Sequence, residues 1–516
     1  MSRHNASIVA AGSRFRAHFR FGLLAAGCAF AFAAPPSTAA ARPLETAITD
    51  GGPFHTEPET AFQRVRAAGA RSVRIYAGWS SVAPAGDEKP DGFDPRDPAD
   101  PAYDWSVLDR QVRAAAASGV SPILAIEKAP LWAVDSDFRR GVDNPDPREF
   151  GNFAFAAARR YSGSFAGLPR VRRWQAWNEP NLSHHLLPQY NTPISEPVSV
   201  QSRPRSPSMY RRLLNAFASA VRRVHSDNVV IAGGLAPFGR YEANDHGVAP
   251  LQFMRKLLCL SPRNKPRRKC KRPSFDVWSV HPYTQGGPTV SAQHPDNVSL
   301  GDVPEVRRAL RAAINAGNIR TKRRVEFWIT EISWDTKPPD PGGVPLKLHA
   351  RWVSEMLYRM WRNHVRLVTW FQLRDAPDPE KPKGREFTSG LYFACSEGFH
   401  CDTPKPSLQA FRFPFVAFRK GGKTARVWGR TPTSRHANVR IQQSRGGRWR
   451  RVARVRADRH GIFKGKVRVR KRGELRAVGV GDRSQPFSLK RPRDLRVNPF
   501  GGCYEAEAED PVCRTD

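Results

Sequence analysis

The sequence predicts an α/β fold: a (β/α)8 TIM barrel followed by a small all-β, sandwich-like domain. Three observations support this class. Short apolar runs alternate with amphipathic patterns over about 375 residues, a length that suits such a barrel. The long connections mostly follow the apolar runs. Beyond residue 418 the hydrophobic pattern changes to period two, which is typical of antiparallel strands. A chain of 516 residues also exceeds the usual size of one domain.

Eight apolar runs are expected to form the barrel strands. They are residues 44–50, 72–79, 122–127, 171–179, 228–235, 275–283, 324–331 and 366–372. Continuous apolar runs such as 229–236 are typical of parallel strands that are buried on both faces. Between the runs, apolar residues recur every three and four positions, which predicts helices. These stretches are 57–68, 105–117, 150–161, 209–225, 303–316, 348–361 and, as the eighth helix, 404–411.

The long connections indicate where the active face lies. Those rich in Pro, Gly and Asn follow strands, at 182–206, 284–302, 335–345 and 374–404. Loops at the carboxyl ends of the strands build the active face of a TIM barrel. One long connection, 261–274, follows a helix instead and is placed at the opposite end.

The remaining segments complete the predicted domain organisation. Residues 1–41 read as a signal peptide, with basic Arg14, Arg16 and Arg20 before an apolar run at 21–34 and small residues at 39–41. Residues 42–418 form the catalytic barrel, 419–493 a basic β-sandwich-like module and 494–516 an acidic tail. No later apolar run reaches the roughly 20 residues of a membrane span, so no transmembrane anchor is expected. A loose lipoprotein box at 25–28 leaves a lipid anchor as the alternative to a secreted or extracytoplasmic protein.

Six strands are expected in the basic module. They are 424–430, 439–444, 449–456, 462–469, 475–480 and 486–489. Between residues 419 and 493, 25 Lys and Arg face three acidic residues, a net charge of +22 out of +37 for the chain. Such a segment commonly binds nucleic acid. An exported protein instead meets acidic cell-wall polymers, anionic lipids or acidic glycans. An acidic polymer is therefore the expected partner, with a solvated basic surface as the alternative and no nucleic acid expected.

The cysteines that follow the signal segment fall into close pairs. The pairs are Cys259 with Cys270, Cys395 with Cys401, and Cys503 with Cys513. The last pair would close the acidic tail. Metal binding is the alternative, but no pair has C-x-x-C spacing and none lies near clustered histidines. Local disulfides in an oxidising compartment are therefore expected, and no metal or cofactor.

Two glutamates end predicted barrel strands: Glu179 the fourth and Glu331 the seventh. A lone glutamate in this position more often caps a helix or pairs with an arginine. Retaining glycoside hydrolysis, however, needs two carboxyl groups about 5 to 5.5 Å apart on neighbouring rigid supports. Strands four and seven provide such supports across the mouth of a barrel. The pair therefore favours a glycosidase.

Residues 44–418 resemble the clan A glycoside hydrolases, which carry an acid/base on strand four and a nucleophile on strand seven. The run 177–181, Trp-Asn-Glu-Pro-Asn, is closest to the family 39 pattern. The runs 73–79 and 103–109 are similar to family 5. The resemblance implies that Glu179 is the acid/base, that Asn178 binds the sugar 2-hydroxyl and that Glu331 is the nucleophile.

Further matches to the clan lie at other strand ends. The resemblance implies that Arg74 keeps the nucleophile ionised, that His281 and Tyr283 form the element whose hydroxyl contacts the nucleophile, and that Trp370 lies under the sugar ring. The structural alternatives are a surface ion pair for the arginine, a purely structural bond for the histidine or tyrosine, and a core position for the tryptophan. Glu127, at the end of the third run, is expected to cap a helix or form a salt bridge.

The two catalytic roles require different protonation states. Glu179 is expected to stay protonated because Trp174 or Trp177 desolvates it, and strand alternation would point Trp177 and Glu179 to one face. Glu331 is expected to stay ionised through Arg74 and Tyr283. The predicted function is a secreted retaining glycoside hydrolase that cleaves a β-linked oligo- or polysaccharide by double displacement. The alternatives are a catalytically silent glycan-binding protein and a transglycosylase on the same barrel. Barrel activity is expected to survive removal of residues 420–516.

Overall fold

The computed structural model describes residues 42–135, 141–192, 199, 202–239, 241–242, 245–267, 271–376, 387–433, 435–470 and 473–497. The predicted signal peptide and the tail beyond residue 497 lie outside the described residues. The chain divides into two units, Met1–Ala40 and Ala41–Asp516, and every described residue belongs to the second. Among the described helices, none combines the length and apolarity needed to cross a membrane.

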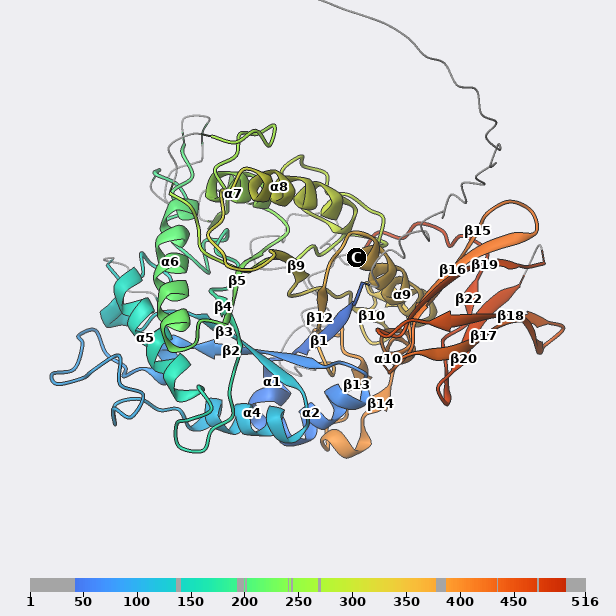
Figure 1. The fold of residues 1–516 in the computed structure, drawn as a ribbon, viewed down its shortest axis with the longest axis horizontal. Coiled ribbons are helices and arrows are strands. Elements are labelled where there is room, and N and C mark those ends of the chain that lie inside the picture. Colours follow the sequence, from blue (N-terminus) through green and yellow to red (C-terminus); the bar gives the residue numbers. More distant parts are fainter. Residues whose placement is uncertain are drawn as a thin grey trace, which may run out of the picture. The chain divides into compact units, whose positions relative to one another are not determined.

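Eight parallel strands close into a barrel (Figure 1). In their order around the barrel they are β1 (Glu45–Thr49), β12 (Leu367–Phe371), β9 (Glu326–Ile329), β8 (Val277–Val280), β5 (Val229–Leu235), β4 (Arg173–Ala176), β3 (Ser121–Glu127) and β2 (Ser72–Gly78). Every neighbouring pair is parallel. All eight predicted runs therefore form barrel strands, and the predicted fold class is confirmed.

Helices follow the strands along the chain. They are α1 (Gly52–Thr56), α2 (Pro58–Ala67), α3 (Trp79–Val82), α4 (Ser106–Ala117), α5 (Pro147–Arg160), α6 (Ser206–Val224), α7 (Pro250–Leu257), α8 (Val303–Asn315), α9 (Leu346–Arg362) and α10 (Pro406–Arg412). The 3-10 turns are η1 (Leu131–Ala133), η2 (Leu300–Asp302) and η3 (Phe399–Cys401). Short strand pairs join β6 (Tyr241–Glu242) to β7 (Asp245–His246), β10 (Thr336–Lys337) to β11 (Val344–Pro345), and β13 (Tyr392–Phe393) to β14 (Thr403–Pro404).

Local sequence explains where α5 begins and which face it buries. Asp146 is the N-cap, and its carboxylate accepts the backbone N–H groups of Arg148 (2.6 Å) and Glu149 (3.2 Å). A proline at the first helical position suits the helix start. Phe150 and Phe153 are buried. Their spacing of three places them on the stripe that packs against the sheet.

The barrel interior changes from apolar to polar along the strands. Near the amino ends lies a closed cluster of Ala47, Ile123, Ile231, Val277, Trp328 and Leu367. Residues two positions further along a strand point to the same side. Most of the buried side chains there are polar, namely Thr49, Arg74, Gln175, Ser279, Thr330 and Thr369, and the layer also contains Ala125 and Gly233. The apolar layer closes the amino end, and the polar layer supports the side chains at the carboxyl end.

The C-terminal module consists of two antiparallel sheets. The first contains β15 (Phe415–Arg419), β16 (Thr424–Arg430) and β19 (Ile462–Arg468). The second contains β18 (Arg448–Ala457), β17 (Ala437–Arg445), β20 (Glu474–Gly479) and β21 (Asp482–Arg483), with β22 (Phe487–Ser488) also paired to β20. The six predicted strands are present. The strands β15 and β21 were not predicted, and β15 pairs with the module although most of it precedes residue 419.

One hydrophobic core runs from the barrel into the module. Arg430 of β16 is buried and donates to the carbonyls of Leu44 (3.0 Å) and Phe411 (3.3 Å). The rings of Tyr358 in α9 and Trp428 in β16 lie 5.4 Å apart. Removing the module would expose this apolar surface and leave polar groups unpaired. The packing therefore argues against the expectation that the barrel works without residues 420–516.

The structure tests part of the predicted disulfide pattern. Cys395 and Cys401 are bonded, as predicted. Cys259 is also bonded, and its predicted partner Cys270 lies outside the described residues, as do Cys503 and Cys513.

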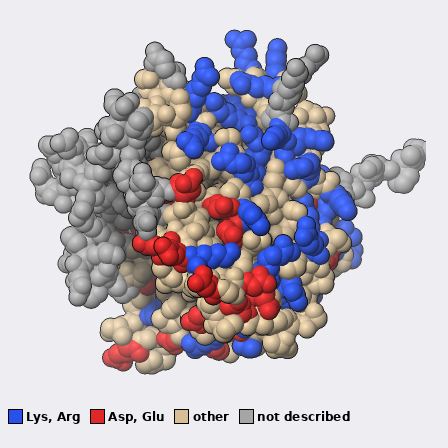
Figure 2. Space-filling model, turned by 90° about the vertical axis from the view of Figure 1, so that its left-hand side faces the viewer, with Lys and Arg blue, Asp and Glu red and all other residues tan. Residues whose placement is uncertain are grey.

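Charge is also uneven outside the module. Figure 2 shows the side of the molecule on which α5 and α6 lie in Figure 1. Basic side chains dominate the upper part of this face, and acidic side chains gather below them.

Candidate active site

Three side chains donate hydrogen bonds to Glu331, which lies two residues beyond the end of β9. Arg74 Nη1 (2.7 Å) and the Tyr76 hydroxyl (2.8 Å) contact Oε1, and the Tyr283 hydroxyl (3.2 Å) contacts Oε2. An ionised carboxylate accepts such bonds through both oxygens, whereas a protonated one would have to donate. The surroundings therefore favour the anionic form of Glu331.

Arg74 is fully buried and each of its three guanidinium nitrogens has a partner. Besides Glu331, it donates from Nε to Gln175 Oε1 (2.9 Å) and from Nη2 to Asn178 Oδ1 (2.7 Å). Burial acts to lower its pKa, but the neighbouring Tyr76 and Glu331 outweigh that effect and raise it. The alternative of a surface ion pair is therefore wrong.

Both tyrosines keep their protons. Burial, followed by the charge of Glu331, raises the pKa of Tyr76 and of Tyr283 well above the usual value. Each hydroxyl therefore remains a hydrogen-bond donor. Sequence reasoning missed Tyr76, although it follows Arg74 by two residues on β2 and strand alternation places it on the same face.

Gly234 makes room for the side chain of Gln175. Gln175 is a partner of Arg74 that sequence reasoning missed. Gly234 has φ +61°, and a Cβ there would lie 2.7 Å from Gln175 Nε2 and 3.3 Å from His281 Nε2. Only glycine fits this close approach and this backbone conformation without strain. Gln175 Nε2 donates to the carbonyl of Trp177 (3.1 Å), which fixes the amide that holds Arg74.

The backbone leaves strand geometry before it reaches Glu179. Strand β4 ends at Ala176, and both Trp177 (φ +69°) and Glu179 (φ +40°) lie in the left-handed region. Such conformations are uncommon outside glycine and concentrate at functional sites. Trp177 is buried and packs against Phe150, with centroids 5.4 Å apart, whereas Glu179 turns toward His281. The prediction that alternation points Trp177 and Glu179 to one face is wrong.

Two imidazoles contact the carboxylate of Glu179. Oε1 lies 2.7 Å from His281 Nδ1, and Oε2 lies 3.4 Å from His185 Nε2. His281 Nε2 lies 3.0 Å from the hydroxyl of Thr330. We assign the proton of a neutral His281 to Nδ1, which donates to Glu179, while Nε2 accepts from Thr330.

The protonation of Glu179 differs from the expectation. Burial acts to raise its pKa, but the contacts with His185 and His281 outweigh burial and lower it. Burial acts to lower the pKa of His185, but Glu179 and Glu127 outweigh it and raise that pKa. The prediction that desolvation keeps Glu179 protonated is wrong for the free protein. The lowered pKa of Glu179 and the raised pKa of His185 together favour a proton on His185.

Glu127, at the end of β3, is a third carboxyl group of the site. It is buried, and its Oε2 lies 3.8 Å from His185 Nδ1. Burial raises its pKa, against the attraction of His185 and Arg74. The contact with His185 is the predicted salt bridge, and it acts through charge alone, because no hydrogen bond joins the two atoms.

The separation of the two main carboxyl groups fits a retaining mechanism. One oxygen of Glu179 and one of Glu331 lie within 4.8 Å of each other and of a ring nitrogen of His281. Retaining glycosidases hold their carboxyl groups about 5 to 5.5 Å apart, and inverting ones about 6.5 to 9.5 Å. These three residues also have the atom types of a metal site, but Arg74 already neutralises Glu331 and Nδ1 of His281 bears the proton donated to Glu179.

The structure brings six of the predicted site residues together and leaves one out. The six are Arg74, Asn178, Glu179, His281, Tyr283 and Glu331. Trp370 is fully buried, donates from Nε1 to the carbonyl of Ser389 (3.0 Å), and packs against His349 of α9 and Phe411 of α10. It faces the helices, so the prediction of a sugar platform is wrong.

Phe371, one residue later, points to the inner side of the barrel. It is two residues beyond Thr369 on β12 and is partly exposed. Its N–H donates to the carbonyl of Ile332 (3.2 Å), next to Glu331, and its ring meets Phe387 edge-on at 5.3 Å. Phe371, rather than Trp370, is therefore the aromatic residue of β12 on the inner side of the barrel.

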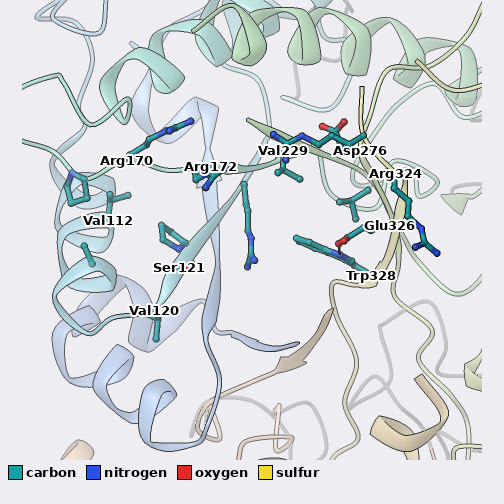
Figure 3. Close-up of a pocket in the computed structure, with 16 residues that line it drawn as sticks. Val112, Val120, Ser121, Arg170, Arg172, Val229, Asp276, Arg324, Glu326 and Trp328 are labelled. Atoms are coloured by element: carbon teal, nitrogen blue, oxygen red, sulfur yellow. Dashed lines mark hydrogen bonds between the residues drawn. The ribbon is translucent and has the colours of Figure 1, made fainter. Parts of the chain in front are cut away.

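Cavities lie at both ends of the barrel. A cavity of about 440 Å³ at the carboxyl end is lined by loop residues that include Lys128, Leu131 and His184. A larger one, of about 700 Å³, lies at the amino ends of the strands above Trp328 (Figure 3). Its arginines are Arg170, Arg172, Arg173, Arg323 and Arg324.

The fold is similar to that of known glycosidases. A family 39 glycoside hydrolase from the gut symbiont Bacteroides cellulosilyticus matches at 18% identity, over 85% of this chain and 81% of that one, with a TM-score of 0.50. A glucosidase from Croceicoccus marinus matches at 13% identity over 80% and 91% of the two chains, with a TM-score of 0.43. The family 1 β-glucosidase from Thermotoga maritima matches at 11% identity over 71% and 95%, with a TM-score of 0.45. No family model and no curated protein matches the chain. At this identity the family 39 likeness establishes the fold.

Proposed function

We propose that the protein is a secreted retaining glycoside hydrolase that acts on a β-linked oligo- or polysaccharide. The observation that carries this proposal is the pair Glu179 and Glu331, with carboxylate oxygens within 4.8 Å and in different electrostatic surroundings. Arg74 and two tyrosines surround Glu331, and two imidazoles surround Glu179. The fold likeness to a family 39 glycoside hydrolase and the Cys395–Cys401 disulfide, a bond that persists in oxidising compartments, also support it.

In the first step, Glu331 attacks the anomeric carbon while the bond to the leaving oxygen breaks. Glu179 delivers a proton to that oxygen, so the aglycone departs as a neutral alcohol and a glycosyl ester remains on Glu331. In the second step, Glu179 takes a proton from water, which attacks the same carbon and breaks its ester bond to Glu331. Two inversions leave the configuration unchanged, and both carboxyl groups return to their starting forms.

The donated proton belongs to a coupled pair. Glu179 and His185 are in contact, so the proton that lies between them titrates with the pair rather than with either residue alone. Glu127 lies 3.8 Å from the other ring nitrogen of His185, and its negative charge favours the protonated imidazole. We infer that Glu179 passes this proton to the leaving oxygen as negative charge develops there.

Asn178 and Phe371 are suited to hold the sugar. Arg74 occupies the carbonyl oxygen of Asn178, which leaves the amide N–H groups available as donors to the 2-hydroxyl. Phe371 offers a partly exposed ring to the apolar face of a sugar. In this proposal Phe371 takes the role that the sequence had assigned to Trp370.

The test is chemical rescue of Glu179→Ala on an activated aryl β-glycoside. We expect hydrolysis to fall sharply and azide to restore turnover, giving a β-glycosyl azide, because azide attacks the glycosyl ester without general-base help. Full activity without azide would contradict the role of Glu179. An α-glycosyl azide would contradict double displacement. Products with lengthened glycans would instead indicate a transglycosylase.

The basic module is proposed to attach the enzyme to an acidic polymer. Its net charge of +22 between residues 419 and 493 supports such a partner, because a concentrated field of one sign attracts polyanions.

A further inference from the structure

The second sheet of the module has one buried face and one exposed face. On the buried face, Val439 and Ile441 of β17 and Leu475 and Ala477 of β20 belong to the core. The residues between them point the other way. The exposed face carries arginines from four strands, which we call the arginine face: Arg440, Arg451, Arg454, Arg456, Arg476 and Arg483.

Strand register places some of these arginines directly opposite one another. Arg440 of β17 is the partner of Arg454 of β18 on one side and of Val478 of β20 on the other, and Val478 is the partner of Arg483 of β21. Directly opposed residues have Cβ atoms about 4.5 to 5.5 Å apart, and like charges in this position destabilise a sheet. This row of arginines therefore lowers the free energy of unfolding of the isolated protein.

Acidic side chains do not offset this cost. In the described part of the chain, Arg440, Arg451, Arg454 and Arg456 form no ion pair. Asp482 lies beside this row, but its carboxylate contacts Arg412 (3.1 Å) and Gln409 (2.9 Å) of α10. On β20, alternation points the acidic residue Glu474 to the exposed face, and it lies at the far end of that strand.

The same face is hollowed. A groove of about 700 Å³ is lined by Asn438, Arg440, Arg454 and residues 478–483, so it runs across the row of opposed arginines. Beside it, Arg476 lies 4.2 Å over the ring of Trp449, and its Nε donates to Gln442 (2.8 Å). Arg476 is thus held in a fixed orientation next to a partly exposed aromatic ring.

We propose that the arginine face binds an acidic polysaccharide, with sugar carboxylates in the groove between Arg440, Arg454 and Arg483. Guanidinium groups pair with carboxylates through two parallel hydrogen bonds, which suits a row of exposed arginines without acidic partners among the described residues. Bound anions would also relieve the repulsion between the opposed side chains. The choice of a polysaccharide rests on the proposed function, because the same chain carries a proposed glycosidase site.

The experiment measures binding of full-length protein carrying Glu331→Gln to polygalacturonate, so that turnover plays no part. Methyl-esterified polygalacturonate, which has the same backbone without the charges, is the matched ligand. The test variant is Arg440→Gln with Arg454→Gln. Its control is Arg426→Gln with Lys466→Gln, which removes two exposed and directly opposed cations from the other sheet.

We expect the test variant to bind roughly 2- to 30-fold more weakly, the range for losing two exposed charge contacts. The control variant should bind like the parent. The affinity should fall as salt rises from about 0.01 to 0.15 M, because the Debye length shrinks from about 30 to 8 Å. Arg440→Lys with Arg454→Lys should lose part of the affinity, since lysine keeps the charge without the two-pronged geometry.

Three results would overturn the inference. Equal losses in test and control variants would indicate diffuse attraction by net charge. Equal binding of the esterified polymer would exclude carboxylate recognition. Tighter binding of a single-stranded oligonucleotide would assign the face to nucleic acid. Failure of the barrel to hydrolyse any glycoside would leave the binding result unaffected, so the two proposals fail separately.

Discussion

Both ends of the barrel hold an arginine–glutamate pair, and their surroundings differ. At the carboxyl end, the Arg74 side chain is fully buried and that of Glu331 is 9% exposed, and two tyrosines complete the contact. At the amino end, Arg173 and Glu45 pair at 2.7 Å with both side chains 25% exposed. Two opposite charges that are shielded from water attract each other much more strongly than two charges that water screens. The larger cavity lies at the amino end, so cavity size alone does not identify the site.

The largest expected effect is the difference in kcat/KM between variants of Glu331 and of Glu326, which begins the same strand. Glu331→Gln should lower kcat/KM by roughly 10⁴-fold or more on an aryl β-glycoside, because it removes the nucleophile. Glu326, at the amino-end start of β9, accepts from Trp328 Nε1 (2.9 Å) and is the matched control. Glu326→Gln should leave kcat/KM close to that of the parent. Similar losses in both variants would place the chemistry elsewhere.

The next comparison concerns the two arginines. Arg74→Lys keeps a positive charge but removes the fork that holds Glu331, Asn178 and Gln175, so kcat should fall about 10²- to 10³-fold, as when a preorganised donor is lost. Unfolding should also be easier, by about 1–3 kcal/mol for each buried partner left without a donor. Arg173→Lys should change stability by less than about 1 kcal/mol and leave kcat unchanged. Unaltered kcat in Arg74→Lys would contradict the role of Arg74.

A third prediction concerns the proton shared by Glu179 and His185. The groups that face His185 are Glu179, Glu127 and Glu331, which together raise its pKa. The alkaline limb of kcat/KM reports loss of the shared proton, so in the parent it follows this raised pKa. In His185→Gln the proton can lie only on Glu179, and the limb should move to lower pH. An unmoved limb would show that His185 has only a structural role.

His225→Gln is the control for that pH profile. His225 contacts the carbonyl of Ser162 (3.1 Å) at the end of α6, away from the carboxylates. This variant should keep the pH profile of the parent even if its stability changes.

The smallest effect concerns stability at the carboxyl end. Burial raises the pKa of Asp50 to about 7, although its carboxylate accepts the N–H groups of Leu373 (3.0 Å) and Arg374 (3.3 Å). The folded protein therefore holds this proton more tightly than the unfolded chain, whose aspartate pKa is about 3.9. The resulting stabilisation is complete below about pH 4 and is lost as pH rises through about 7.

The melting temperature of the parent should therefore fall between about pH 4 and pH 7, the window set by these two pKa values. Asp50→Asn keeps a carbonyl acceptor for both N–H groups and cannot ionise, so it should show a smaller fall. Asp335, whose pKa burial raises to about 7, contributes in the same direction and remains in the variant. An equal fall in both proteins would show that Asp50 does not titrate in this range.

Much of the fold was readable from local patterns. Periodicity located all eight barrel strands, and the strand-end positions of Glu179 and Glu331 predicted that these two would meet. Arg74, His281 and Tyr283 were placed with them by the resemblance to the clan A glycoside hydrolases. The parallel strands of a barrel all have their carboxyl ends at the same rim, so residues at strand ends lie close together even when they are far apart in the chain. Tyr76 was within reach of the same reasoning, because it shares the face of Arg74.

Three features required the folded chain, and each has a physical cause. Trp370 faces α9 and α10 while Phe371 faces the rim, because the inner side of β12 depends on its register with β1 and β9. The low pKa of Glu179 depends on His185 and His281, which a turned backbone and a distant strand bring to it. The opposed arginines of the module depend on pairing between β17 and β18. Amino-acid order determined which groups were available for chemistry. Register and long-range contacts determined which way those groups point and what charge they carry, because both depend on neighbours far away in the chain.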